Sequence, residues 1–119
     1  PYHCHCLKTA RLLRAAMGWS DAFAPVSFQS RFGREEWLGP ATDDMIASAG
    51  REGVKRLAVM TPGFLADCLE TLEEIAIGGR ETFHAHGGAD FAALPCLNDS
   101  PYMTALLEAL VARETAGWI

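Results

Sequence analysis

The sequence predicts an α/β domain built on a parallel βαβ sheet with helices on both faces. Three observations support this fold class: segments with helical spacing alternate with short β-prone runs, one of these runs is apolar throughout, and 50% of the 119 residues are hydrophobic. Strands that alternate with helices are joined by right-handed crossovers, which leave the strands parallel. A chain of this length buries one core, so we expect one domain over residues 1–119.

The N-terminal third predicts one helix, one strand and one loop. Apolar residues recur at helical spacing over residues 7–17, and Gly18 then supplies a C-cap. A short β-prone run at residues 26–28 follows a proline and predicts a strand that ends near Ser30. Residues 31–40 contain two glycines and a proline, which favour a loop.

The middle of the chain predicts a helix followed by a buried strand. Thr42 is expected to N-cap a helix that reaches about Gly50, and two aspartates follow it where the helix dipole favours negative charge. Residues 55–60 end in four apolar residues, and a run without a polar face is typical of a strand that is buried on both sides.

The C-terminal half predicts a crossover helix, a third strand and a last helix. The crossover helix is expected from Leu65 towards His86, bent at Gly78-Gly79 because glycines weaken a helix. A strand is expected at residues 91–95 and an amphipathic helix at residues 102–114. The apolar side chains expected on the covered face of the crossover helix are Leu65, Leu69, Leu72, Ala76 and Phe83.

The composition argues against several classes of function. The formal net charge of -5 argues against a nucleic-acid partner, because such proteins cluster lysine and arginine to displace counterions. No apolar run approaches the roughly 20 residues that cross a bilayer, and residues 1–6 lack the features of a signal peptide. We therefore expect a cytoplasmic protein with reduced cysteines. The chain opens on Pro1 without an initiating methionine, which suggests that sequence upstream is missing.

Residues 3–6, with the sequence His-Cys-His-Cys, are the most metal-like run of the chain. We expect them to be extended, so that neighbouring side chains point to opposite sides and at most two share an ion. We therefore interpret this run as a surface segment that leads into the first helix.

The segment after the buried strand holds the densest set of ionisable groups, and ligands of parallel sheets bind beyond the carboxyl ends of strands. Asp67, Glu70 and Glu74 follow i, i+3, i+7 spacing, which predicts a stripe of carboxylates on one helical face. Like charges at this spacing repel one another, so a purely structural helix has little reason to keep them. The alternative is a solvated acidic face at a helix N-terminus, where the macrodipole favours carboxylates.

Three motifs in order along the chain resemble those of one family. The first is QSRFG at residues 29–33 followed by WLGP at residues 37–40, the second is PGFLADCLETLEE at residues 62–74, and the third is LN at residues 97–98. Together they resemble the signatures of the ferrochelatases, which insert ferrous iron into a porphyrin. The resemblance implies a Rossmann-like, chelatase-type sheet, and it makes this chain the C-terminal half of a two-domain chelatase whose N-terminal half is absent.

The resemblance assigns roles to residues of these motifs. It implies that Glu70 is the catalytic carboxylate and metal ligand at the porphyrin, and that Glu74 is the next catalytic member of an acidic path to solvent. Carboxylates suit this chemistry because ferrous iron accepts oxygen ligands, and acids can relay the two pyrrole protons that metal insertion releases. The implied substrate-binding residues are Ser30 at a propionate, Trp37 and Phe64 on the walls of the macrocycle cleft, and Asp67 and Cys68 beside the acidic path. The alternatives are core packing for the two aromatic residues and a strand-end hydrogen bond for Ser30.

Two departures from the family pattern and one missing partner limit the implied site. Position 68 is His in some members and Cys here, which removes one possible proton acceptor and leaves a thiol that can still bind metal. Gly78 stands where many members carry an acidic residue, so the path is either shorter or completed by Glu81. The opposing histidine of the family comes from its N-terminal half, and none of the histidines here matches it.

The implied function of the intact protein is a lyase reaction, the insertion of ferrous iron into protoporphyrin IX in the final step of haem biosynthesis. Ferrous iron is a substrate there, no cofactor is required, and no iron–sulfur cluster is expected because no cysteine follows Cys96. The expected partners are the porphyrin, the iron and the protein's own N-terminal half, with peripheral membrane association left open. The fragment alone is expected to be inactive. The alternatives are a non-catalytic α/β module that binds a porphyrin or a metal, and a chelatase for another metal or porphyrin.

Overall fold

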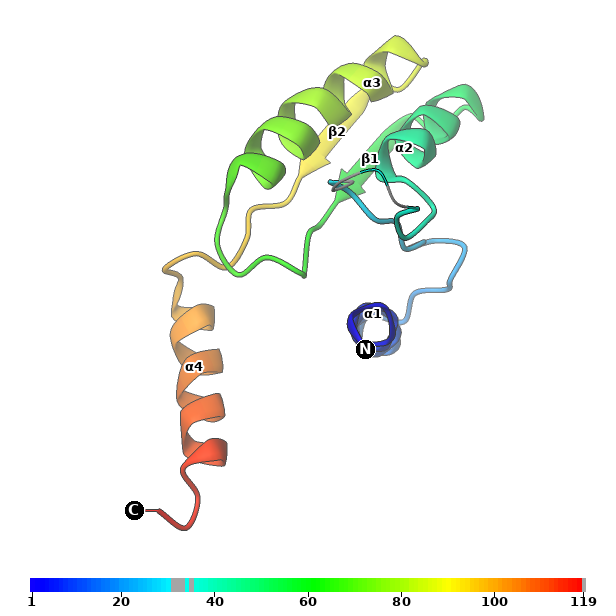
Figure 1. The fold of residues 1–119 in the computed structure, drawn as a ribbon. Coiled ribbons are helices and arrows are strands. Elements are labelled where there is room, and N and C mark those ends of the chain that lie inside the picture. Colours follow the sequence, from blue (N-terminus) through cyan, green and yellow to red (C-terminus); the bar gives the residue numbers. More distant parts are fainter. Residues whose placement is uncertain (31–33, 35, 119) are drawn as a thin grey trace.

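The computed structural model describes residues 1–30, 34 and 36–118 of the chain. A two-stranded parallel sheet lies at its centre, in which β1 (Arg56–Val59) pairs along its whole length with β2 (Asp90–Ala93). The helices are α1 (Tyr2–Met17), α2 (Thr42–Arg51), the π-helix η1 (Glu70–Gly79), α3 (Arg80–Ala85) and α4 (Pro101–Glu114) (Figure 1). A parallel sheet with a helical crossover confirms the predicted α/β class.

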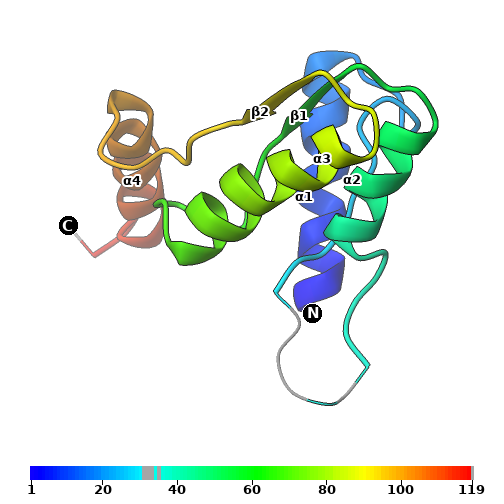
Figure 2. The same ribbon diagram turned by 90° about the horizontal axis from the view of Figure 1, so that it is seen from above.

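The helices cover one face of the sheet. η1 and α3 follow each other as one rod, and this η1–α3 rod and α2 lie on the same side of the strands (Figures 1 and 2). On that side Leu57 and Phe91 are half-buried, whereas Ala58 and Ala92 on the other side are exposed. α1, seen end-on in Figure 1, and α4 lie beside the sheet, so no helix of the described residues stacks on the second face. For these residues, the expected burial of residues 55–60 on both sides and the expected helices on both faces are therefore wrong.

The expected strand at residues 26–28 is not formed. Phe28 instead makes an isolated parallel bridge with Ala41. Its N–H donates to the Pro40 carbonyl at 2.9 Å, and its carbonyl accepts from the Thr42 N–H at 3.0 Å. The pairing stops there because the opposing segment turns directly into α2. The β-prone residues therefore anchor a loop and do not extend the sheet.

The crossover helix starts later than expected and is wound differently. Residues 62–68 precede it without helical winding, and a π-helix then leads into α3. A π-helix bonds residues five apart, so residues four apart lie just under one turn from each other. Residues at this spacing form the buried side of the rod, which consists of Thr71, Ile75, Gly79 and Phe83. The expectation for Leu65, Leu69 and Leu72 is wrong, because these side chains point away from the packed side and are 49%, 68% and 54% exposed.

The core lies between the η1–α3 rod, α2 and β2. Phe83 is fully buried, and its ring centroid lies 6.0 Å from that of Phe91. A Cβ on Gly79 would stand 3.1 Å from Phe91 Cζ and 3.2 Å from Ile46 Cδ1, so a larger residue fits here only if these side chains shift by a few tenths of an ångström. The winding changes from π to α directly after Gly79, and the bend expected at Gly78-Gly79 stays a prediction.

The remaining helices follow most of their predicted signals. α1 ends at Gly18, which is left-handed with φ 68°, and α4 begins after Ser100, whose side chain caps it. α2 includes Thr42, so Ala41 occupies the N-cap position instead. α1 already contains residues 3–6, and the expectation that they are extended is wrong because the preceding proline suits a helix start. Within the described residues, no helix combines the length and the apolar character that a membrane span needs.

Candidate functional site

The loops that leave the two strands meet at the start of η1, at the edge of the sheet where ligands of parallel sheets bind. Asp67 lies in the loop after β1, and Asn98 lies in the loop after β2. The Asp67 N–H donates to Asn98 Oδ1 at 2.8 Å, and Asn98 Nδ2 donates to Asp67 Oδ2 at 2.8 Å. We name these two residues the Asp67–Asn98 pair. The pair fastens the second loop to the residues that enter the helix.

Thr71 ties the first loop to the first turn of η1. Its buried hydroxyl accepts from the Cys68 N–H at 3.0 Å and donates to Asp67 Oδ1 at 2.9 Å. Two hydrogen bonds hold the pKa of Asp67 below its ordinary value of 3.8: the one from Asn98 contributes most, and the one from Thr71 contributes less. Asp67 precedes the helix, so the expected stripe of three carboxylates on one helical face is wrong. Both oxygens of Asp67 are engaged by protein donors.

Glu70 is the first residue of η1 and is half-buried. A hydrogen bond from the Cys68 side chain, and a smaller contribution from the Glu70 backbone N–H, hold the pKa of this carboxyl below its ordinary value of 4.5. Glu70 is therefore ionised at neutral pH, and a carboxylate has more acceptor sites than these bonds occupy. Cys68 lies two residues before Glu70 at the entry of η1, and its role beside the acidic path stays a prediction.

Glu74 lies one turn further along η1 and meets the first motif of the sequence. Its Oε2 accepts from Ser30 Oγ at 2.7 Å and from Gln29 Nε2 at 3.0 Å. Ser30 has a left-handed φ of 60°. Ser30 therefore contacts the second carboxylate, a role that the sequence did not predict for it. Residues 31–33 of the same motif lie outside the described residues.

A polar hollow of about 400 Å³ opens beside Glu74. It is lined by residues of η1, α3, α2 and the first motif, namely Gln29, Ser30, Asp43, Glu74, Gly78 and Thr82. Glu81, one of the two alternatives for the end of the acidic path, is not part of this lining. Asp43 supplies the second carboxylate instead. Sequence reasoning missed this role, because Asp43 stands at a helix start and its position was fully explained by the helix dipole.

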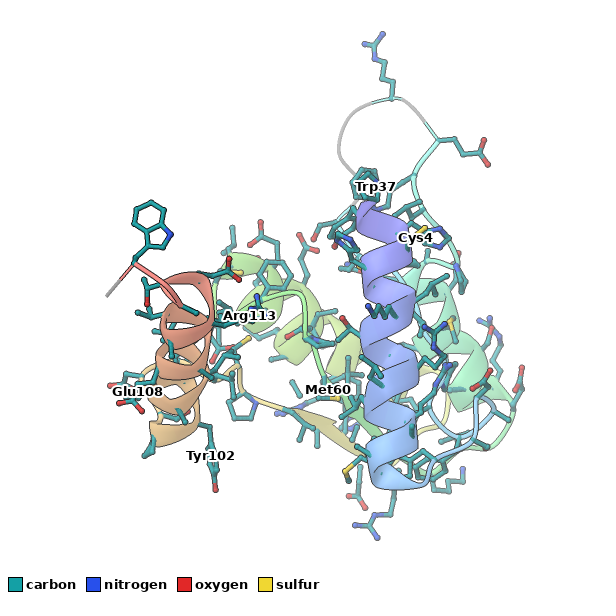
Figure 3. All side chains as sticks on the ribbon, turned by 90° about the horizontal axis from the view of Figure 1, so that it is seen from below. Cys4, Trp37, Met60, Tyr102, Glu108 and Arg113 are labelled. Atoms are coloured by element: carbon teal, nitrogen blue, oxygen red, sulfur yellow. The ribbon has the colours of Figure 1, made fainter. Side chains whose placement is uncertain are left out.

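A second hollow, of about 600 Å³, shares Gln29, Ser30 and Asp43 with the first and continues over the loop before α2. Its large apolar lining residues are Phe28, Trp37 and Leu38. Trp37 lies near the end of the loop that precedes α2 and is 42% exposed (Figure 3). Phe64 lines neither of these two hollows and is 40% exposed. The structure therefore brings Ser30 and Trp37 to one groove and leaves Phe64 on a separate loop.

Cys96 belongs to the same polar cluster, although its sequence context gave no role for it. Its Sγ lies 3.5 Å from Thr61 Oγ1, and its N–H donates to Asp67 Oδ1 at 3.4 Å. Burial, with a smaller contribution from Asp67, raises the pKa of the thiol above its ordinary value of 9.0. Cys96 is therefore protonated at neutral pH and is a poor nucleophile. The only signal for it in the sequence is its position directly after a strand.

Residues 3–6, considered as metal ligands from the sequence, form the start of α1. The His3 ring packs near Phe28, with 5.4 Å between ring centroids. In the part of the chain that the structure describes, no three side chains of histidine, cysteine, aspartate or glutamate are placed to hold one metal ion. Cys4, Cys6, Cys68 and Cys96 are unbridged in the structure.

The chain matches known proteins along its whole length. The sequence model of the family described as Ferrochelatase matches residues 1–115. Over 119 residues, the chain is 57% identical to a ferrochelatase of Rhizobium meliloti, 56% to one of Allorhizobium ampelinum and 50% to one of Mesorhizobium japonicum. Each comparison covers 100% of this chain and only 34% to 35% of the relative, so the chain spans about a third of their length. The chain belongs to the ferrochelatase family.

Proposed function

We propose that the intact protein is a lyase that inserts ferrous iron into protoporphyrin IX and so forms haem. Membership of the ferrochelatase family supports the reaction class. The structural observation that carries the proposal is the placement of Glu70 and Glu74 one turn apart on η1, beyond the carboxyl ends of both strands. Ligand sites of parallel sheets lie at this edge.

The proposed chemistry needs groups that accept protons and a metal ion. Two pyrrole protons leave the porphyrin as iron enters, and an ionised carboxylate accepts either a proton or the ion. Glu70 is charged at neutral pH, since its pKa lies below an ordinary value that is itself well below 7, so it suits the position next to the macrocycle. Glu74 is held by Ser30 and Gln29 beside the polar hollow, and it suits the transfer of a proton or an ion towards solvent.

A porphyrin is a flat, largely apolar ligand, so its cleft needs apolar walls and a few polar groups at the rim. The groove that contains Trp37 supports one such wall, and Ser30 lies between this groove and Glu74. Contacts of Ser30 with a propionate, and of Phe64, Asp67 and Cys68 with the substrate, remain predictions.

The other parts of the cleft are proposed to come from the remaining two-thirds of the protein. From the order of its motifs we place this chain in the C-terminal part, and we place the opposing histidine in the N-terminal half. Iron and porphyrin act as substrates without a further cofactor, in the cytoplasm or at the surface of a membrane. The chain alone is then expected to be inactive.

The test of this proposal is Glu70→Gln in the full-length protein. The substitution keeps the shape of the side chain and removes its charge. We expect kcat for iron insertion to fall by about 100-fold, because general acid–base groups contribute about 10² to 10⁴ in rate. The rate is followed as the loss of porphyrin fluorescence under anaerobic ferrous iron.

Glu73→Gln is the matched control, since Glu73 is an exposed neighbour on the same helix and should leave the rate unchanged. Folded Glu70→Gln protein with a rate close to that of the wild type would contradict the proposal.

The alternative function, a non-catalytic porphyrin-binding module, has one observation in its favour, the exposed Trp37 in a groove of about 600 Å³. Saturable quenching of tryptophan fluorescence, when the 119-residue chain is titrated with protoporphyrin, would support it. Absence of saturable binding would favour a cleft that needs the rest of the protein.

A further inference from the structure

Asn98 reaches from the loop after β2 to the entry of η1 with both its backbone and its side chain. Its N–H donates to the Leu65 carbonyl at 2.9 Å, and its Oδ1 accepts from the Asp67 N–H at 2.8 Å. Its Nδ2 donates to Asp67 Oδ2 at 2.8 Å and lies 3.2 Å from the Cys96 carbonyl. The Asn98 side chain therefore makes two hydrogen bonds with Asp67, which comes before the helix, and one with Cys96 in its own loop.

The amide of asparagine is the side chain that fits this place. Aspartate would keep the acceptor for the Asp67 N–H and lose both donated bonds, and its charge would face the Asp67 carboxylate. The backbone also favours asparagine, because Asn98 has a φ of 50° and asparagine tolerates left-handed geometry better than most residues. Geometry and hydrogen bonding thus select the same residue.

The Asp67–Asn98 pair is connected to Glu70 by a short series of contacts. Asp67 Oδ1 accepts from Thr71 Oγ1, and the same hydroxyl accepts from the Cys68 N–H. Thr71 directly follows Glu70, the first residue of η1, so these bonds fix the backbone on both sides of Glu70. Residues 67–71 therefore form one hydrogen-bonded turn, and Asn98 holds that turn from outside.

We propose that Asn98 is a positioning residue for Glu70: its side chain holds the entry of η1 in place and thereby sets where the Glu70 carboxylate stands relative to the porphyrin. The inference deepens the proposed function, because it relies on the role of Glu70 in iron insertion. Asn98 itself does not touch the substrate in this account. A misplacement of about 1 Å at a reacting group can lower a rate by about 100-fold, so the loss of this contact should be visible in kcat.

The test uses Asn98→Gly and Asn98→Asp in the full-length protein. Glycine accepts the left-handed backbone and removes only the side-chain bonds, so this variant is expected to fold. Aspartate keeps one bond and adds charge repulsion. Asp99→Asn is the matched control, because Asp99 is an exposed neighbour in the same turn.

For folded Asn98→Gly and Asn98→Asp, we expect kcat to fall by 10-fold to 100-fold while KM for the porphyrin changes by less than about 2-fold. Hydrogen exchange at the Asp67 amide should become faster in Asn98→Gly, because that N–H loses its acceptor. Asp99→Asn should match the wild type in each measurement. A double variant, Asp67→Asn with Asn98→Asp, restores one donor and one acceptor and should recover part of kcat.

An unchanged kcat in folded Asn98→Gly would show that Asn98 has only a structural role and would overturn the inference. Unchanged protection of the Asp67 amide would overturn it as well. Failure of the proposed function is recognised separately, as normal turnover in Glu70→Gln. The exchange measurement at Asp67 does not depend on that result.

Discussion

The two ends of the η1–α3 rod are held by different interactions. At the α3 end, Phe83 is fully buried beside the sheet. At the η1 end, Asp67 and Thr71 are held by hydrogen bonds, while Leu69 and Leu72 remain 68% and 54% exposed. The buried apolar side chains of the rod, Ile75 and Phe83, thus lie in its middle and at its α3 end, whereas Glu70 opens the η1 end. The η1–α3 rod therefore carries both packing residues and proposed catalytic residues, at different positions along its length.

The two ends also differ in which interactions are satisfied within this chain. Among the described residues, no buried side-chain nitrogen or oxygen lacks a hydrogen-bond partner, so the polar network at the η1 end is complete. The apolar side of the same end is not covered, which agrees with a chain that spans about a third of its relatives. The hydrogen bonds among Asp67, Thr71 and Asn98 are thus formed within this chain, whereas the chain leaves Leu69 and Leu72 exposed.

We expect the largest loss of stability for Phe83→Ala, at the α3 end of the rod. Removal of a fully buried phenylalanine leaves a cavity and typically lowers the free energy of unfolding by about 3–5 kcal/mol. Denaturant titration of the variant measures this loss. Phe23→Ala is the control, because Phe23 is 71% exposed and its truncation should change stability by less than about 0.5 kcal/mol. Equal losses in the two variants would mean that the α3 end is not the stabilising end.

We expect a smaller change in stability from substitutions at Gly78 and Gly79, where the π-helix ends. In Gly79→Ala the new methyl group would stand 3.1 Å from Phe91 and 3.2 Å from Ile46, so we expect a loss of about 1–3 kcal/mol from overpacking. At Gly78 the nearest atom to a new Cβ is the Glu73 carbonyl oxygen at 3.5 Å, an ordinary contact. Gly78→Ala should therefore be neutral or stabilising by up to about 1 kcal/mol through helix propensity. Thermal unfolding of the two variants should shift in opposite directions, and a shift in the same direction would contradict the packing at Gly79.

We expect the smallest change in stability from the protonation of Asp67 at the η1 end as the pH falls. The folded-state pKa of Asp67 lies below its ordinary 3.8, so this group contributes stability above that value, and the contribution is lost as pH falls through the folded pKa. Urea midpoints measured from about pH 5 down to about pH 2 should fall less steeply in Asp67→Asn than in the wild type. Identical slopes would indicate that Asp67 does not hold its hydrogen bonds in solution.

Local signals in the sequence predicted much of the fold. Gly18 and Ser100 mark helix ends through their own backbone and side-chain preferences, and apolar runs marked both strands of the sheet. The π winding of η1 and the single bridge at Phe28 were not predicted, because both depend on contacts with distant segments. A period of about four residues in apolar side chains does not distinguish π from α winding.

For the site, the sequence predicted the location of the main residues but not the hydrogen bonds between them. Glu70, Glu74 and Cys68 lie at the expected edge of the sheet, because the carboxyl ends of parallel strands meet there. The reciprocal bonds of Asp67 with Asn98, 31 residues away, were not predicted, since spacing along the chain does not specify which polar groups pair across two loops. The hydrogen bond between Ser30 and Glu74 was not predicted for the same reason.

The most direct test of this account measures turnover and stability together in Glu70→Gln and in Phe83→Leu, both made in the full-length protein. The account predicts that Glu70→Gln loses about 100-fold in kcat with an unchanged Tm. It predicts the reverse for Phe83→Leu, a lowered Tm with unchanged kcat per folded molecule. Wild-type kcat in folded Glu70→Gln would contradict the account.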